Sequence, residues 1–170
     1  MRSRNFKTKL LEKNSGKRLN PHGIVLHETA TPGATAQAEY KYFSRETNRS
    51  AHAFIDWYED LQIVPWNVKA WHAREPANSM FIGVEMCRPK THDPEKMKIV
   101  YWATVDAFAR IYRWILEERT VTPENLMTHH EVTLKWKRST HTDPTGLFKE
   151  YGYTIEQFRA DVQYRLDKKW

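Results

Sequence analysis

The residues of this chain that could carry chemistry are its eight histidines, which stand in segments far apart in the sequence. Imidazole is the commonest metal ligand in proteins and also moves protons near neutral pH. A catalytic zinc ion usually takes three protein ligands and keeps a fourth position for water. The helical His-Glu-x-x-His motif is absent, because Thr31 rather than a histidine stands four positions after His27. A metal site in this chain must therefore be assembled from distant segments.

Three places are the best candidates for such ligands. His27 closes a short apolar run, His129 and His130 stand side by side, and Asp143 follows His141 in the segment His-Thr-Asp-Pro. Strand ends and loops are where a rigid sheet presents ligands to a cleft. Spacing alone does not choose between the two adjacent histidines, and it leaves open whether His141 or Asp143 is the third ligand.

The elements that must position these residues follow from hydrophobic periodicity and cap signals. The pattern predicts strands over 23–27, 51–57, 61–65 and 81–87, and helices over 34–47, 95–119 and 154–166. The second and third strands read as a hairpin. A short helix is expected after Thr122-Pro123-Glu124, ending before His129, and 134–146 reads as a loop. This order predicts an α/β fold, with helices packed on a central mixed β-sheet.

Length and composition favour one globular domain. The 170 residues are 40% hydrophobic and 28% charged, and residues 1–20 read as a basic arm ahead of a domain over 21–170. No apolar run approaches the roughly 20 residues of a membrane span, so no membrane insertion is expected. The arm lacks the apolar stretch of a secretory signal, and the single cysteine excludes an internal disulfide.

The net charge of +6 favours polyanionic partners. Nucleic acid is disfavoured, because the basic residues are scattered instead of clustered on one helix face. A cell wall that bears carboxylates and phosphates fits the charge equally well. A monomer is expected.

Six segments in order resemble the zinc-dependent N-acetylmuramoyl-L-alanine amidases of the type 2 family, which are similar to the peptidoglycan recognition proteins. The segments are Gly23 to Thr29, Ser50 to Asp56, Ala70 to Ala73, Asn78 with Ile82 to Cys87, His129 to Val132, and Asp143 to Gly146. Each is common alone, but six in family order are specific. The resemblance covers most of the chain and implies a mixed sheet flanked by helices.

The resemblance implies that His27, His129 and Asp143 hold zinc. His129 is preferred to His130 because it stands three positions before Val132, as in the family motif. Glu85 is implied as the general base that takes a proton from water and passes it to the leaving nitrogen. Strand alternation places Glu85 on the face opposite to its apolar neighbours.

The resemblance also implies roles around this centre. His141 stands where much of the family has a lysine that stabilises the developing oxyanion, and a histidine N–H can do the same work. The remaining cleft candidates are His52, Trp71, His72 and Asn78. The expected reaction is zinc-dependent hydrolysis of the amide between N-acetylmuramic acid and L-alanine in bacterial peptidoglycan.

The expected amidase could act in either of two biological settings, and one alternative function competes with it. The missing signal favours a phage or prophage endolysin, made in the host cytoplasm and acting on the wall after release, over a bacterial autolysin. The rival is a module of the same fold that binds peptidoglycan without cutting it. Such modules typically lose a metal ligand, whereas His27, His129, Asp143 and Glu85 are all present.

Overall fold

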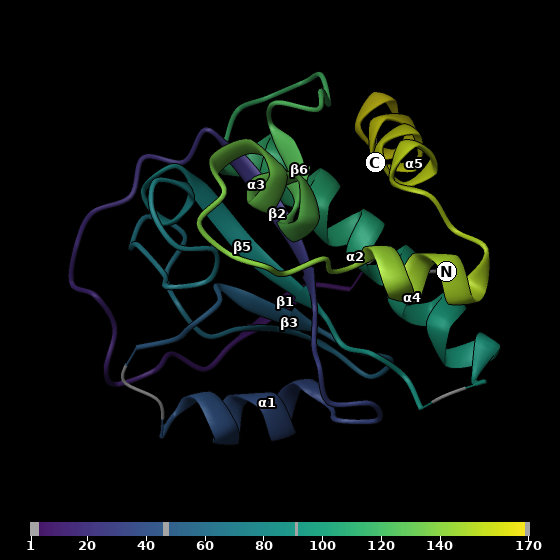
Figure 1. The fold of residues 1–170 in the computed structure, drawn as a ribbon, viewed down its shortest axis with the longest axis horizontal. Helices are drawn as coiled ribbons and strands as arrows, with labels where there is room; N and C mark the ends of the chain where they lie inside the picture. The colour runs from purple at the N-terminus through teal and green to yellow at the C-terminus, as the bar shows by residue number, and fades with distance from the viewer. Residues whose placement is uncertain (1–3, 46–47, 91, 169–170) are drawn as a thin grey trace.

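The computed structural model describes residues 4–45, 48–90 and 92–168. A mixed six-stranded sheet forms its centre, with helices on both faces (Figure 1). The strands lie in the order β1-β4-β3-β5-β2-β6, and only the β3–β4 pair is antiparallel. Their bounds are β1 Phe6–Thr8, β2 Gly23–Glu28, β3 Ala53–Ile55, β4 Asp60–Gln62, β5 Phe81–Met86 and β6 Leu126–Thr128. The α/β fold with a mixed sheet is as predicted.

The helices divide between the two faces of this sheet. They are α1 Ala36–Phe43, the short 3-10 helix η1 Ala77–Ser79, α2 Pro94–Trp114, α3 His129–Trp136, α4 Thr145–Tyr151 and α5 Ile155–Asp167. Helix α1 lies on one side, and α2, backed by α5, covers the other (Figure 1). No described helix is long and apolar enough to cross a membrane.

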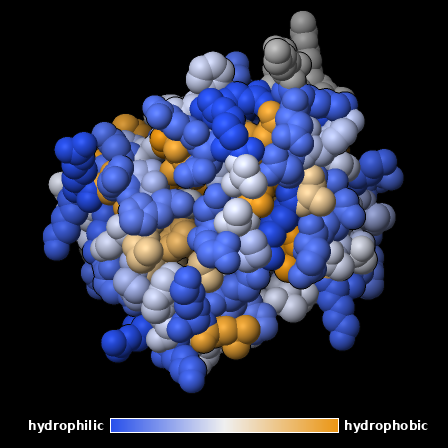
Figure 2. Space-filling model, turned by 90° about the horizontal axis from the view of Figure 1, so that it is seen from above, coloured by the Kyte–Doolittle hydropathy of each residue, from blue (hydrophilic) through white to orange (hydrophobic). Residues whose placement is uncertain are grey.

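The largest apolar cluster fills the space between the sheet and α2. Ile82, Val84 and Met86 of β5 are fully buried there, next to Ile24 and Leu26 of β2. The alternate residues of both strands face the opposite side of the sheet, as the period of two requires. That opposite side carries the polar side chains of the candidate site. The face seen in Figure 2 is mostly hydrophilic, with hydrophobic side chains in small separate patches.

Side-chain caps begin the two longest helices close to their predicted starts. The Asp93 side chain accepts a hydrogen bond from the Lys96 backbone N–H ahead of α2, and Thr154 accepts from the Gln157 N–H ahead of α5. Both helices begin within one residue of the prediction. Helix α2 ends at Trp114, earlier than the predicted Arg119.

Several predicted boundaries are wrong. Thr122 opens a turn closed by the Asn125 side chain, and strand β6 follows where a short helix was expected. The segment 134–146 is only partly a loop, since α3 runs to Trp136 and α4 begins at Thr145. The first helix spans Ala36–Phe43, shorter than predicted, and positions 46–47 of that prediction lie outside the described residues.

The basic N-terminal segment packs against the sheet. Its residues 6–8 form β1 and pair with β4 in parallel, and both Leu11 and Leu19 are buried. Arg4 forms an ion pair of 2.8 Å with Asp60, which also pairs with Arg110 at 2.6 Å. The described part of the segment expected to be an arm therefore extends the edge of the sheet.

Candidate active site

The first candidate ligand lies at the carboxyl end of an inner strand. His27 is the fifth residue of β2, which is hydrogen-bonded to β5 on one side and to β6 on the other. Its side chain is only 2% exposed. Burial lowers the pKa of His27 to about 4, with nearby His129 acting in the same direction. The imidazole is therefore neutral at pH 7, which is the form that binds metals.

The second candidate ligand is fixed by a helix cap. Strand β6 ends at Thr128, whose side chain accepts a hydrogen bond from the Glu131 backbone N–H, while the Glu131 carboxylate accepts from the Thr128 N–H. This capping box begins α3 at His129, directly at the junction of strand and helix. Arg159 of α5 donates to both oxygens of the Glu131 carboxylate and so braces the cap.

The third candidate ligand comes from the loop before α4. The Asp143 carbonyl accepts a hydrogen bond of 3.1 Å from the His130 backbone N–H, which ties the loop to the first turn of α3. Burial alone would raise the pKa of the Asp143 carboxyl, but hydrogen bonds from His129 and His27 hold that pKa below its usual range. Asp143 is therefore ionised at neutral pH.

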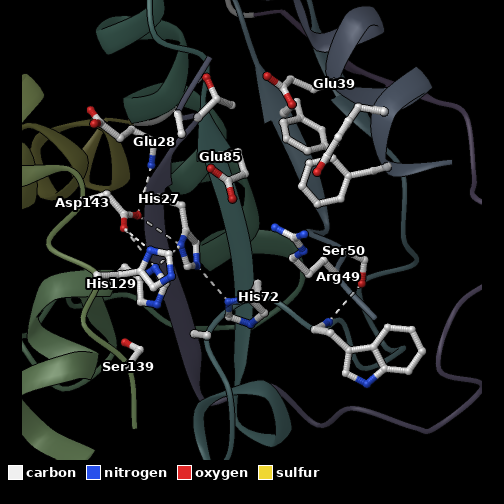
Figure 3. A pocket seen from close by; sticks show the side chains of 18 of the residues that line it. His27, Glu28, Glu39, Arg49, Ser50, His72, Glu85, His129, Ser139 and Asp143 are labelled. Carbon is white, nitrogen blue, oxygen red and sulfur yellow. Dashed lines mark hydrogen bonds and ion pairs between the residues drawn. The ribbon is translucent and has the colours of Figure 1, made fainter. Parts of the chain in front are cut away.

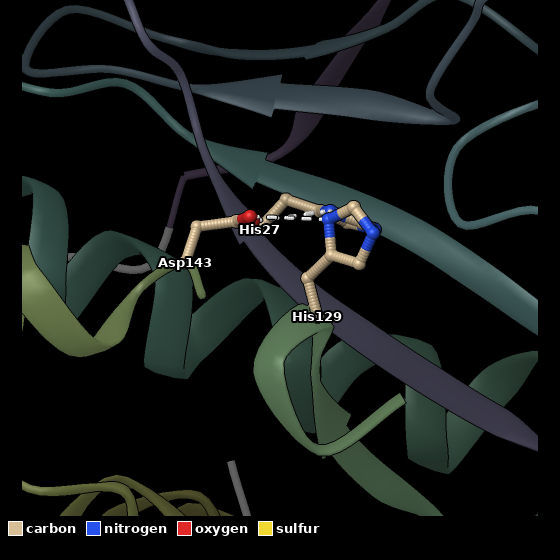
Figure 4. A group of neighbouring side chains, drawn as sticks. All are labelled: His27, His129 and Asp143. Atoms are coloured by element: carbon tan, nitrogen blue, oxygen red, sulfur yellow. Dashed lines mark hydrogen bonds and ion pairs between the residues drawn. The ribbon is translucent and has the colours of Figure 1, made fainter. Parts of the chain in front are cut away.

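These three side chains converge on one point, although they are far apart in sequence (Figure 4). The Nδ1 atoms of His27 and His129 lie 3.1 Å apart. The Asp143 carboxylate lies 3.3 Å from the first nitrogen and 3.1 Å from the second. One potential ligand atom from each residue lies within 4.8 Å of the other two.

The geometry and the donor types fit a divalent cation. The two imidazole nitrogens face each other beside the carboxylate, and all three groups can offer a lone pair to a metal ion. A tetrahedral ion with bonds of about 2.0–2.1 Å needs ligand atoms about 3.3 Å apart. Two imidazoles and one carboxylate also suit zinc and leave a position open.

Glu85 lies beside this cluster. It is paired in register with His27 on the adjacent strand β5, so both side chains project from the same face of the sheet. Its Oε2 atom is buried and has no hydrogen-bond partner among the described residues. Burial, followed by the charges of Asp143 and Glu39, raises the pKa of Glu85 well above its usual value. A carboxyl in this state is suited to accept and return a proton.

A second layer holds His27 in place. The Nδ1 atom of His72 lies 2.9 Å from the free Nε2 of His27. Gly83 makes room for His72, since a Cβ atom there would come within 2.4 Å of the imidazole. The Asn78 side-chain oxygen accepts from the backbone N–H groups of His72 and Ala73 and fixes their loop. His72 and Asn78 are thus placed at the site, where they support the ligand residues.

A cleft of about 650 Å³ opens over these residues (Figure 3). His27, His129 and Asp143 lie at one side of the cleft, and Glu85 lies between them and Glu39. Trp71 lines the cleft as predicted, and its backbone N–H is held by Ser50 Oγ at 3.0 Å. The cleft therefore brings together eight of the nine residues named from the sequence.

His52 is the exception, and its expected place in the cleft is wrong. Its side chain is fully buried and does not line the cleft. Its Nδ1 accepts a hydrogen bond of 2.9 Å from the Gly83 backbone N–H, and its Nε2 lies 2.9 Å from the Val68 carbonyl. These bonds join β5 to the 68–72 segment, so His52 supports the floor of the site from within.

His130 and His141 differ in their position relative to the ligand cluster. His130 points away from the cluster, with its Nδ1 atom 3.1 Å from Thr145 Oγ1. His141 is 64% exposed and stacks on His129 with ring centroids 4.5 Å apart. Its Nδ1 atom is 3.7 Å from Asp143 Oδ1. His141 therefore stands at the exposed side of the cluster and lines the cleft.

Sequence reasoning did not identify several residues that line the cleft: Glu28, Thr29, Glu39, Arg49 and Arg74. Glu28 follows His27 at the end of β2, and burial raises its pKa to about 7 even though Arg88 lies 3.0 Å away. Because Glu28 directly follows a predicted ligand at a strand end, the sequence could have indicated that it lines the cleft. Glu39 and Arg74 lie on a helix and a loop whose approach to the site depends on tertiary structure.

Comparisons with known proteins agree with this geometry. Residues 17–146 match the family model described as N-acetylmuramoyl-L-alanine amidase. Protein Ami of Listeria monocytogenes is 31% identical over 81% of this chain, and a probable N-acetylmuramoyl-L-alanine amidase of Bacillus licheniformis is 31% identical over 86%. The chain spans only 15% and 42% of these two relatives.

Solved structures share the fold. The hydrolase AmiA of Staphylococcus aureus, solved with its ligand, superposes with a TM-score of 0.87 at 21% identity, covering 98% of this chain and 85% of that one. PlyL superposes with a TM-score of 0.74 at 21% identity, covering 96% and 98%. With the match of the family model over most of its length, this chain belongs to the N-acetylmuramoyl-L-alanine amidase family.

Proposed function

We propose that this protein is a zinc-dependent hydrolase that cuts the amide bond between N-acetylmuramic acid and L-alanine in bacterial peptidoglycan. The observation that carries the proposal is the convergence of His27, His129 and Asp143 beside Glu85 in one cleft. Family membership supports the amidase chemistry. The binding-only alternative would have no use for a carboxylate beside the ligands that keeps a buried oxygen without a hydrogen-bond partner among the described residues.

Zinc held by His27, His129 and Asp143 would polarise the amide carbonyl and lower the pKa of water at the site. The chain supplies the remaining functions. His72 fixes the orientation of the His27 ring through its Nε2 atom. The side chain of Asp143 balances part of the positive charge and leaves the site net cationic.

Glu85 performs the proton transfers. Its raised pKa lets it take a proton from the attacking water and keep it long enough to pass it to the leaving nitrogen. His141 stands over His129 at the exposed side of the site and can donate an N–H hydrogen bond to the developing oxyanion. Burial and the nearby His129 lower the pKa of His141, so it acts as a neutral donor at pH 7.

The biological setting is part of the same proposal. We infer that the protein acts on the wall as a monomeric lytic enzyme of the endolysin or autolysin kind, after release from the cell that makes it. Relatives named as an endolysin, as amidases and as an autolysin support a wall-directed role.

The direct test is hydrolysis of purified cell walls. The protein is expected to lower the turbidity of a wall suspension and to release new L-alanine amino termini. A chelator should abolish the activity, and zinc should restore it. The His129→Ala variant should be inactive, whereas His130→Ala serves as the matched control and should retain activity. Wall binding without any new amino termini would favour the binding-only alternative.

A further inference from the structure

Three cationic side chains gather at one end of the cleft. Arg74, Lys137 and Arg138 line a shallow hollow together with Glu75. Arg74 also lines the main cleft, so the hollow adjoins the site that contains His141. All three cations are exposed. The loop that carries two of them leads directly into residues 139–143 of the site.

The charge of this hollow is not balanced within the described part of the chain. Glu75 is its one acidic residue, and its carboxylate is bound by Lys69 and by Ser79 Oγ. Arg74, Lys137 and Arg138 form no ion pair with any described carboxylate. The hollow therefore presents three positive charges toward whatever occupies the end of the cleft.

Two of these cations have a left-handed backbone conformation, which glycine adopts with the least strain. Arg74 has φ 60°, and Lys137, the C-cap of α3, has φ 53°. Left-handed conformations are unfavourable for residues with a Cβ, and helix C-caps of this kind usually carry glycine or asparagine. Retaining long cationic side chains at two such positions in one hollow indicates that the charge itself has a use.

Both backbones are firmly anchored. The Arg74 carbonyl accepts a hydrogen bond of 2.9 Å from the Asn78 N–H. At the end of α3, Trp136 packs on Phe81 of β5 with ring centroids 6.2 Å apart, and the Lys137 N–H donates to the Thr133 carbonyl at 2.8 Å. The positions of the two charges are therefore set before any ligand arrives.

We propose that Arg74, Lys137 and Arg138 form an anion subsite that holds a carboxylate of the peptide part of the substrate. The inference rests on the proposed function, because it assigns one end of the same cleft. A carboxylate of the substrate is preferred to a separate phosphate polymer, since Arg74 lines both the hollow and the cleft. A ligand that extends along the cleft to Arg74 therefore meets the hollow in the same binding event.

The test measures binding in the zinc-loaded Glu85→Gln protein, with a muramyl peptide that ends in a free carboxylate and the same peptide amidated at that end. The Arg74→Gly and Lys137→Gly variants should each weaken binding of the free carboxylate roughly two- to fivefold and leave the amidated peptide unaffected. Lys137→Arg should retain binding. Both glycine variants should also melt at a higher temperature, because they relieve the left-handed strain.

The matched control removes the same charge elsewhere. Lys98 and Lys149 are exposed and line neither the cleft nor the hollow, so Lys98→Gln/Lys149→Gln should bind both peptides as the parent does. Equal losses in this control and in Arg74→Gly/Lys137→Gly would overturn the subsite. Binding of poly(glycerol phosphate) is measured in parallel. If the glycine variants weaken only that binding, the hollow holds a phosphate polymer and the proposal is overturned. Because binding and melting are measured without turnover, failure of the amidase activity on walls would be seen separately.

Discussion

His27 and Glu85 are register partners on the parallel strands β2 and β5. The pairing places a candidate metal ligand and a buried carboxyl side by side on one face of the sheet. Neither residue depends on a flexible loop for its position. The distance between ligand and proton acceptor is therefore set by the hydrogen bonds of the sheet, which is a rigid way to prepare a catalytic pair.

The Glu85→Gln variant separates proton transfer from metal binding. It keeps the shape of the side chain but cannot accept a proton, so turnover should fall roughly 10²- to 10⁴-fold. Zinc content should be unchanged. The melting temperature should stay level or rise, because the variant removes a carboxylate that has a buried oxygen without a partner. Undiminished turnover would exclude Glu85 as the general base.

His141 is tested by two replacements. His141→Ala removes the proposed oxyanion donor and should lower kcat roughly 10²- to 10³-fold. His141→Lys restores a donor and should recover most of the loss. Zinc content, measured by metal analysis, should equal that of the parent in both variants. A chain that loses its zinc on either replacement would make His141 a ligand and would weaken the assignment of Asp143.

The Gly83→Ala variant tests whether His72 holds the His27 ring in position. The new methyl would lie 2.4 Å from the His72 ring, which would have to move away from His27. We expect a loss of stability of about 1–3 kcal/mol and a weaker affinity for zinc. Gly146→Ala is the control, because a Cβ atom there meets nothing within 4 Å. If both variants bind zinc equally well, His72 does not position His27.

The lowered pKa of the buried His52 leads to a prediction of how the free energy of unfolding depends on pH. Burial lowers its pKa to about 4 in the fold, against 6.5 in the unfolded chain. The stabilisation is complete above pH 6.5 and is lost as the pH falls toward 4, by about 3 kcal/mol in total. In the metal-free protein, unfolding by denaturant should therefore show a flatter pH profile for His52→Gln than for the parent.

The exposed His22 provides the comparison for this measurement. His22→Gln should keep the pH profile of the parent. A His52→Gln profile that follows the parent at every pH from 7 to 4 would mean that His52 does not hold its neutral form in the fold.

Much of the fold was predictable because its signals are local. The apolar run before His27 and the alternation around Glu85 predict the two inner strands, and Thr154 marks the start of the last helix by capping. The segment after Thr122 misled the prediction, since Thr-Pro begins turns as well as helices. Strand β6 is only three residues long, and it is stabilised by pairing with β2, which no local pattern reveals.

The ligand positions came from family motifs, and residue spacing alone left alternatives open. His129 and His130 are equivalent in sequence, and only the capping box at Thr128 decides which imidazole faces the cluster. His52 was misplaced because strand alternation cannot distinguish a side chain in the cleft from one in the interior. Arg74 was missed because its left-handed backbone and its approach to Lys137 exist only in the folded chain.

The central claim is most directly tested by anomalous X-ray diffraction at the zinc absorption edge, from crystals of the zinc-loaded protein. A single strong peak is predicted about 2.0–2.2 Å from a ring nitrogen of His27, a ring nitrogen of His129 and a carboxylate oxygen of Asp143. Glu85 should lie beside the peak without contacting it. A peak bound to other residues, or none at this cluster in crystals shown to contain zinc, would contradict the account.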